Sequence, residues 1–277
     1  MQVICPLCQS PMQTSDHRWF CCNNHSFDIA KQGYCNLLAV QHKKSREPGD
    51  SADMVAARHR FLSGGYYQGI SQHVNQLVSS VITAEQSPHI LDAGCGEGYY
   101  TDELRKQLAA DGIASDVMGI DIAKPAVLQA AKRNKNIRWF VANSSRMPVA
   151  DDSAEILLSL FSPIPALEFY RCLKPQGALI LATTGDQHLI ELRELLYDTV
   201  KSDSYTADAS LLEHFTLNKK ITVTETIQLS STQSIKDLLA MTPHYWRVSP
   251  ERKQVLDELS SLQLTIDVQL HLYNPKL

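Results

Sequence analysis

The segment from residue 89 to residue 110 constrains the fold of this chain more than any other. It reads HILDAG, then CGEG, then YYTDELRKQLAA, which is an apolar strand, a glycine-rich turn and a helix. Gly94, Gly96 and Gly98 let the backbone of such a turn approach a ligand closely, at the carboxyl edge of a parallel sheet. The sequence therefore predicts an α/β fold with a ligand site at this turn.

The same alternation of strand and helix continues along the chain. Strands that alternate with helices of about ten residues form βαβ units, and their parallel sheet is covered on both faces. We expect strands at 89–94, 117–122, 137–143, 155–162, 178–185, 221–230 and 264–273. We expect helices at 50–63, 67–82, 99–110, 124–134, 165–173, 188–200 and 234–241.

Two acidic residues limit the class of ligand that the glycine turn can bind. Asp121 ends the next strand, 27 residues after Gly94, where a carboxylate can accept hydrogen bonds from ribose hydroxyls. A dinucleotide site is the main alternative, but its fingerprint is G-x-G-x-x-G and this turn is G-x-G-x-G with Glu97 inside it. A negative side chain disfavours pyrophosphate and suits a ligand that carries positive charge. The turn therefore favours a cationic nucleoside ligand over a dinucleotide.

Composition excludes some classes of function. The chain has 277 residues and a formal net charge of −4, so nucleic-acid binding would depend on local basic patches. No apolar run approaches the roughly 20 residues that span a bilayer, and the first residues lack the features of a signal peptide. We therefore expect a cytoplasmic protein without a membrane partner.

Cysteine and histidine are concentrated near the beginning of the sequence, in CPLC (5–8) and CCNNH (21–25). In a reducing compartment such a group favours a metal over disulfides. Four soft ligands suit tetrahedral Zn²⁺ with no open position, which indicates a structural site. Cys5, Cys8 and His25 are three candidates, and the fourth is Cys21 or Cys22. Spacing alone slightly favours Cys22, because C-N-N-H repeats the spacing of C-P-L-C.

Several segments together resemble the class I S-adenosylmethionine-dependent methyltransferases. DAGCGEGYY (92–100) is similar to the motif around the methionine part of the cofactor, and GIDIA (119–123) to the ribose-binding strand end. ANSSRMP (142–148) resembles the adenine-contacting loop, and RCLKPQG (171–177) the turn before the fifth strand. The resemblance covers about residues 86–200. It implies a Rossmann-like, seven-stranded sheet whose last strand is antiparallel.

The end of the fourth strand bears on which atom is methylated. Enzymes that methylate exocyclic amines resemble N/D-P-P-[FYW] there, whereas this chain has FSPIP (161–165). That departure disfavours an exocyclic amine and leaves a ring nitrogen open. Ser162, or Glu168 on the following helix, is a candidate on position alone to hold the acceptor or take its proton.

The combination of a zinc module and a class I methyltransferase resembles the RlmA family of 23S rRNA guanine-N1 methyltransferases. CPLC, HSFDIAKQGYCNLL, QHKKSREPGDSADMVAARHRFL, DAGCGEGYY and LLAMTPHYW carry the resemblance, which runs nearly end to end. It implies methyl transfer to N1 of a guanine in a domain II hairpin of 23S rRNA, helix 35. It also implies zinc ligands at Cys5, Cys8, Cys21 and His25, and cofactor contacts that include Tyr67, Glu97 and His188.

These observations give a complete set of expectations. The domains are a zinc-binding module (1–36), a basic linker with helices (37–85) and a methyltransferase domain (86–277). The expected cofactor-binding residues are Tyr67, Asp92, Gly94, Cys95, Gly96, Glu97, Gly98, Asp121, Ile122, Asn143, Ser144 and His188. The expected RNA-binding residues are Lys43, Lys44, Arg46, Arg58 and Arg60. A homodimer would widen an RNA cleft. The alternatives are a small-molecule methyltransferase and a non-catalytic RNA-binding module.

Overall fold

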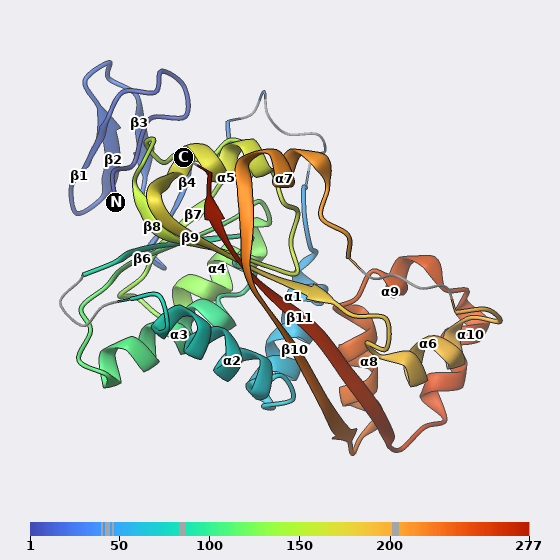
Figure 1. Cartoon of the computed structure of the whole chain (residues 1–277). Coiled ribbons are helices and arrows are strands. Elements are labelled where there is room, and N and C mark those ends of the chain that lie inside the picture. Colours follow the sequence, from blue (N-terminus) through green and yellow to red (C-terminus); the bar gives the residue numbers. More distant parts are fainter. Residues whose placement is uncertain (40, 42–44, 46, 83–86, 201–204, 277) are drawn as a thin grey trace.

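One large sheet organises the molecule (Figure 1). The computed structural model describes residues 1–39, 41, 45, 47–82, 87–200 and 205–276. Among these residues the sheet has eight strands in the order β10-β11-β9-β8-β5-β6-β7-β4. Their bounds are β4 (Tyr34–Asn36), β5 (His89–Ala93), β6 (Asp116–Asp121), β7 (Arg138–Val141), β8 (Ala154–Leu160), β9 (Leu173–Thr184), β10 (Phe215–Leu229) and β11 (Leu262–Pro275).

The strand directions confirm the predicted class I fold. Strands β4 to β9 pair in parallel, whereas β11 is antiparallel to both β9 and β10. The chain order reverses between β5 and β8, which lie side by side. Ligands of open α/β sheets bind outside the carboxyl ends of the strands at such a reversal. The glycine turn after β5 and the FSPIP segment after β8 therefore meet where a ligand is expected.

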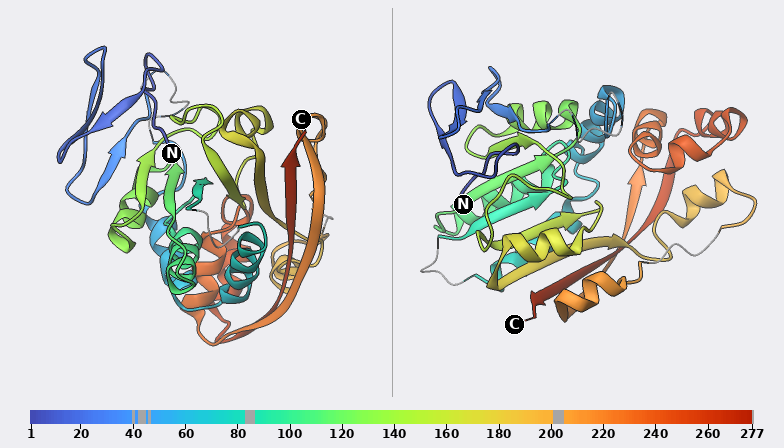
Figure 2. Two further views of the ribbon diagram at one scale, coloured as in Figure 1. Left: turned by 60° about the vertical axis from the view of Figure 1, so that its left-hand side comes forward. Right: turned by 90° about the horizontal axis from the view of Figure 1, so that it is seen from above.

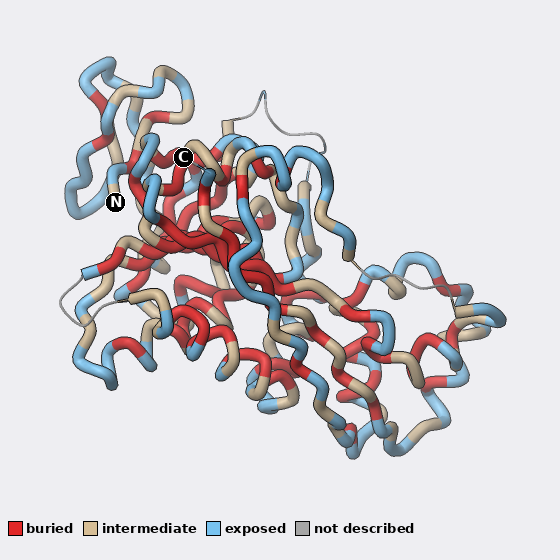
Figure 3. The backbone as a smooth tube through the Cα atoms, viewed as in Figure 1, coloured by how far each residue is buried: buried red, intermediate tan, exposed pale blue. Residues whose placement is uncertain are grey.

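Each face of the sheet has its own apolar core, because neighbouring residues of a strand point to opposite faces. Ile90 belongs to one core and Leu91 to the other, and Figure 3 shows the buried residues concentrated along the sheet. The first core includes residues of α1 (Ala52–Ser63), α2 (Gln68–Ser79), α3 (Tyr99–Ala110) and α4 (Lys124–Arg133). The second includes residues of α5 (Ala166–Cys172) and α7 (Ala209–His214). No helix among the described residues is long and apolar enough to cross a bilayer.

The remaining helices lie around the far end of the paired strands β10 and β11, at the opposite end of the molecule from the N-terminal module (Figures 1 and 2). They are α6 (Ile190–Leu196), α8 (Thr232–Ala240), α9 (His244–Arg247) and α10 (Pro250–Asp257). The sequence did not predict α9 or α10, nor the short helix α7 described above. Only Leu256 of α10 is buried, so the helix has too few apolar positions for a clear 3.6-residue period.

Most predicted elements are confirmed within a few residues, and two strands are longer than predicted. Helix α1 begins at Ala52, within two residues of the predicted start, and the hydroxyl of its N-cap Ser51 accepts from Met54 N at 3.3 Å. Strand β9 starts at Leu173 and therefore includes KPQG. The Pro and Gly of this segment usually mark a turn, so the sequence predicted a later start. Strand β10 starts at Phe215, and its next five residues are all exposed. An edge segment without a buried face shows no alternation in sequence, so its strand is hidden from a pattern argument.

The N-terminal module is a small antiparallel sheet of β1 (Met12–Thr14), β2 (Arg18–Cys21) and β3 (Ser26–Asp28). Strand β4 follows it and pairs with β7 of the large sheet, so the large sheet has one strand beyond the predicted seven. Backbone hydrogen bonds also join Ile4 N to Pro148 O at 3.0 Å and Leu37 N to Val141 O at 2.9 Å. The module is therefore held against the segment that follows β7.

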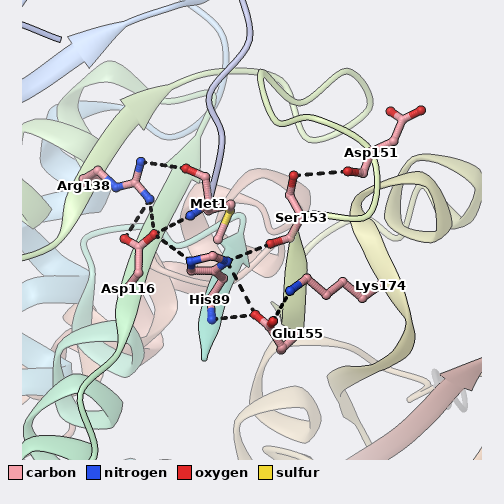
Figure 4. Close-up of polar contacts among 8 residues, drawn as sticks. All are labelled: Met1, His89, Asp116, Arg138, Asp151, Ser153, Glu155 and Lys174. Atoms are coloured by element: carbon pink, nitrogen blue, oxygen red, sulfur yellow. Dashed lines mark hydrogen bonds and ion pairs between the residues drawn. The ribbon is translucent and has the colours of Figure 1, made fainter. Parts of the chain in front are cut away.

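A network of charged groups joins the amino ends of the central strands (Figure 4). Asp116 accepts from the backbone nitrogen of Met1 at 2.7 Å and from the guanidinium of Arg138. The ring of His89 lies between two carboxylates, with Nε2 3.7 Å from Asp116 Oδ2 and Nδ1 3.6 Å from Glu155 Oε2. This network stands at the edge of the sheet opposite to the glycine turn, so it holds the strands and lies outside the ligand site.

Candidate functional site

The glycine turn after β5 adopts a conformation that L side chains rarely take. Gly94 has φ +89° and Gly98 has φ +82°. A Cβ on Gly94 would lie 2.3 Å from Ser162 Oγ, and one on Gly98 would lie 2.8 Å from the Cβ of Ala130. Both positions therefore require glycine, and the turn packs directly on the segment that follows β8.

Asp121 is tied to the glycine turn by its carboxylate. Gly96 N donates to Asp121 Oδ2 at 2.9 Å, and Ala123 N donates to Oδ1 at 2.7 Å. Burial raises the pKa of this carboxyl above its usual value. A carboxylate has about four lone-pair sites, so each oxygen can still accept from a ribose hydroxyl. Ile122, the next residue, is partly buried.

Asp92 lies beneath the turn and is almost fully buried. Its Oδ2 accepts from the hydroxyl of Thr101 at 2.5 Å, and its Oδ1 has no partner among the described residues. Burial raises the pKa of Asp92 to about 7. A positively charged ligand in the turn would favour the ionised form of this carboxyl.

Glu97 is 1% exposed and is held by two residues that the sequence did not reveal. Its Oε2 accepts from Arg133 Nη2 at 2.6 Å and lies 2.9 Å from Nδ1 of His59. Its Oε1 is buried without a partner among the described residues. The arrangement therefore leaves one carboxylate oxygen for a cationic group, such as the ammonium of a methionine moiety.

Tyr67 and His188 lie together although they are far apart in sequence. His188 Nδ1 accepts from Asp267 N at 3.3 Å, so Nε2 carries the proton and donates to the hydroxyl of Tyr67 at 3.4 Å. Burial lowers the pKa of His188 to about 4, which keeps the imidazole neutral. The Tyr67 hydroxyl is then free to donate to a ligand.

Tyr100 is a third residue that the sequence did not reveal. Its hydroxyl is buried and has no partner among the described residues. Its pKa is raised well above the usual value, mainly by burial and then by nearby Tyr67, and Glu97 contributes as well. The hydroxyl of Tyr100 is therefore available to a ligand.

The other predicted cofactor residues line the same edge of the sheet. Asn143 and Ser144 follow β7 and are partly buried. Asn143 Oδ1 accepts from Ser145 N at 2.9 Å and so shapes the turn that the sequence assigns to adenine. Cys95 is buried inside the glycine turn.

The two candidates on the acceptor side are already bonded within the chain. Ser162 Oγ donates to Ala93 O at 2.8 Å. Glu168 Oε1 accepts from Met147 N at 2.5 Å and from Arg171 at 2.6 Å, while Oε2 accepts from Arg171 at 3.0 Å. Glu168 therefore holds the loop after β7, and its Oε2, which accepts one hydrogen bond from the described residues, is the oxygen with more remaining capacity to accept.

The structure brings Cys5, Cys8, Cys21 and His25 together, with their ligand atoms all within 4.8 Å of one another. The sulfurs of Cys8 and Cys21 are 3.7 Å apart, and His25 Nδ1 lies 3.5 Å from the sulfurs of Cys5 and Cys21. A regular tetrahedron with ordinary zinc bond lengths has edges of about 3.8 Å between sulfurs and about 3.5 Å between sulfur and nitrogen. The four atoms therefore fit zinc. Cys22 is exposed and outside this group.

The predicted basic residues divide into two sets. Lys43, Lys44 and Arg46 lie outside the described residues. Arg58 forms an ion pair with Asp50. Arg60 forms a two-pronged pair with Asp237, at 2.6 and 2.9 Å, yet its side chain is 52% exposed. Arg60 can therefore still reach a phosphate group.

Comparison with known proteins bears on both parts of the chain. Residues 3–46 match a family model described as "RlmA, N-terminal", and residues 90–177 match one described as "Methyltransferase domain". A Bacillus subtilis protein named "Putative 23S rRNA (guanine-N(1)-)-methyltransferase YxjB" is 34% identical over 96% of this chain and 94% of its own length. The "23S rRNA (guanine(748)-N(1))-methyltransferase" of Streptomyces fradiae is 29% identical over 89% of this chain and 86% of its own length. A solved phosphoethanolamine N-methyltransferase from Haemonchus contortus is 14% identical, with a TM-score of 0.46, over 82% of this chain and 58% of its own.

Proposed function

Because this chain belongs to the RlmA family of 23S rRNA (guanine-N1)-methyltransferases, we propose that it methylates N1 of a guanine in 23S rRNA. The family relationship makes it an S-adenosylmethionine-dependent enzyme with a structural zinc ion. The finer proposal is that the target guanine lies in the domain II hairpin called helix 35.

The position of the zinc module carries this proposal. The module is bonded through Ile4 to Pro148, in the segment that also contains the predicted adenine contacts Asn143 and Ser144. A zinc ion stabilises a small module whose own core is too small to fold alone. A module of this kind, fixed beside the cofactor site, can hold an RNA hairpin through its shape and phosphates while one base enters the site. A small substrate would need no such attachment.

We assign the cofactor site to the residues that meet at the carboxyl edge of β5 and β6. S-adenosylmethionine supplies a methyl group on a positively charged sulfur. Asp121 would accept from the ribose hydroxyls, and the free oxygen of Glu97 would accept from the ammonium group. Tyr67, oriented by His188, would donate to the carboxylate end. The zinc ligands in this proposal are Cys5, Cys8, Cys21 and His25.

The proposed acceptor, guanine N1, must lose a proton during methylation. Neutral guanine carries hydrogen on N1, so N1 would bond to the methyl carbon only as this proton passes to a base or to water, while the bond from sulfur to the methyl carbon breaks and leaves S-adenosylhomocysteine. The site must also hold N1 in line with the bond from sulfur to the methyl carbon. Ser162 could contact the base through its hydroxyl oxygen. Glu168 is engaged with Arg171, and its assignment as the base stays a prediction.

One experiment separates this function from the alternatives. The protein is incubated with labelled S-adenosylmethionine and either an unmodified 23S rRNA transcript or a pool of small metabolites. Label in RNA, with a primer-extension stop at a guanine of helix 35, would support the full proposal. A stop elsewhere would reject only the hairpin, and label confined to metabolites would reject the RNA substrate. No label in either pool would favour a binding module.

Two further expectations stay predictions. A cytoplasmic location would suit an enzyme of ribosomal RNA. A homodimer would be tested by sedimentation of the zinc-loaded protein, alone and with the hairpin.

A further inference from the structure

Phe161, the last residue before the Ser162–Pro163 turn, has an unusual backbone conformation. Its φ is +57°, in the left-handed region that bulky residues rarely enter. Such a conformation is energetically unfavourable for a bulky residue and persists only where neighbouring contacts enforce it. Strain of this kind concentrates at functional sites.

Hydrogen bonds on both sides hold Phe161 in this conformation. Its own N–H donates to Ala182 O on β9 at 2.9 Å. The adjacent Ser162 donates to Ala93 O on β5 at 2.8 Å, and the hydroxyls of Ser159 and Ser162 are 3.1 Å apart. The turn is therefore pinned to the strands on either side of β8.

The side chain of Phe161 recovers little of this cost by burial. It is 40% exposed, and its ring lies 6.1 Å from the ring of Tyr100, tilted by 44°. Leu189, another apolar residue at positive φ (+53°), is by contrast 2% exposed, so its conformation serves the core. The strain at Phe161 instead keeps an aromatic face in solvent.

The position of the exposed Phe161 ring in the fold determines what the ring can bind. Phe161 follows β8 at the switch point, and its neighbour Ser162 touches the glycine turn at Gly94. Tyr100, against which the ring rests, is the second residue of α3, the helix after that turn. Trp246 is more exposed, at 70%, but it lies on α9, where its ring contacts Tyr245. Among the residues that the structure describes, Phe161 is therefore an exposed aromatic side chain beside the proposed methyl donor.

We propose that Phe161 is the stacking platform for the guanine that is methylated. The inference rests on the proposed function, since it assumes a planar base as acceptor. An extruded base is commonly held between aromatic or apolar side chains, and stacking on one aromatic ring contributes about 1–3 kcal/mol. The platform would hold the plane of the base fixed while N1 faces the methyl group.

Three variants of Phe161 test this role. Phe161→Leu keeps an apolar side chain of similar size without a π face, and Phe161→Tyr keeps the face. Phe161→Asn removes the ring with a residue that tolerates the left-handed region. The measurements are single-turnover methylation of an unmodified 23S rRNA transcript, the dissociation constant of S-adenosylhomocysteine, and thermal stability.

Phe161→Leu and Phe161→Asn should lower methylation efficiency about tenfold to hundredfold. Phe161→Tyr should retain most activity, the dissociation constant of S-adenosylhomocysteine should change less than about twofold, and Phe161→Asn should not lower the melting temperature. Methylation by Phe161→Leu at the wild-type rate would overturn the proposal. So would an equal loss of S-adenosylhomocysteine binding, or a melting temperature several degrees lower in Phe161→Asn. Methylation by the wild-type protein tests the function itself, so the two failures are distinct.

Discussion

Replacing Asp92 by Asn should make the free protein more stable at alkaline pH and leave it nearly unchanged in acid. Asp92 is buried beneath the glycine turn, one oxygen bonded to Thr101 and the other without a described partner. Burial raises its pKa from 3.8 to about 7. Asparagine has the shape of the protonated carboxyl and cannot ionise.

The sign and size of the effect follow from this pKa. Since the folded-state value lies above the unfolded one, the contribution of Asp92 to stability is fully present below pH 3.8 and is lost as the pH rises through about 7. One pKa unit corresponds to about 1.4 kcal/mol, so the full loss is about 4 kcal/mol. Between pH 5.5 and pH 8 the loss is about 2 kcal/mol.

Urea unfolding of the wild type and of Asp92→Asn at these two pH values measures the effect. Other titrating groups are shared, so they cancel when the two proteins are compared. Asp111→Asn, at an exposed position, is the matched control and should show no pH-dependent difference. If the difference between the wild type and Asp92→Asn were the same at both pH values, the assignment of a buried, protonated Asp92 would be wrong. The same substitution should weaken binding of S-adenosylmethionine, because the variant cannot supply a negative charge.

Three further outcomes are expected. Cys21→Ser should release zinc and Cys22→Ser should retain it, as metal content after gel filtration would show; retention by both would remove Cys21 from the ligand set. Gly94→Ala should destabilise the fold by about 1–3 kcal/mol or more. Its φ is +89°, and the added Cβ would lie 2.3 Å from Ser162 Oγ. Thermal unfolding of the variant at the wild-type temperature would contradict that geometry. Glu168→Gln should keep single-turnover methylation within a few-fold of wild type, because the carboxylate already accepts three hydrogen bonds within the chain. A loss of a hundredfold or more would instead support Glu168 as the base.

Local patterns in the sequence determined the main part of the fold. Alternating strands and helices, with glycines at fixed offsets, specify βαβ units because residue periodicity depends only on neighbours along the chain. The strand–turn–helix from residue 89 to residue 110 is therefore confirmed almost residue by residue. The candidate ligands of the zinc group also followed from spacing, apart from the choice between Cys21 and Cys22. Edge segments such as the first part of β10, with no buried face, had no pattern to recognise.

Only the tertiary structure decided which distant residues meet. Glu97 is bonded by Arg133, 36 residues away, and lies beside His59, 38 residues away on the other side. No local pattern encodes such pairings, because they depend on how helices pack on a sheet. The fold of the N-terminal module likewise buries Cys21 and exposes Cys22. The large sheet sets Phe161 at a positive φ with its ring exposed, since the hydrogen bonds that enforce this conformation come from two neighbouring strands.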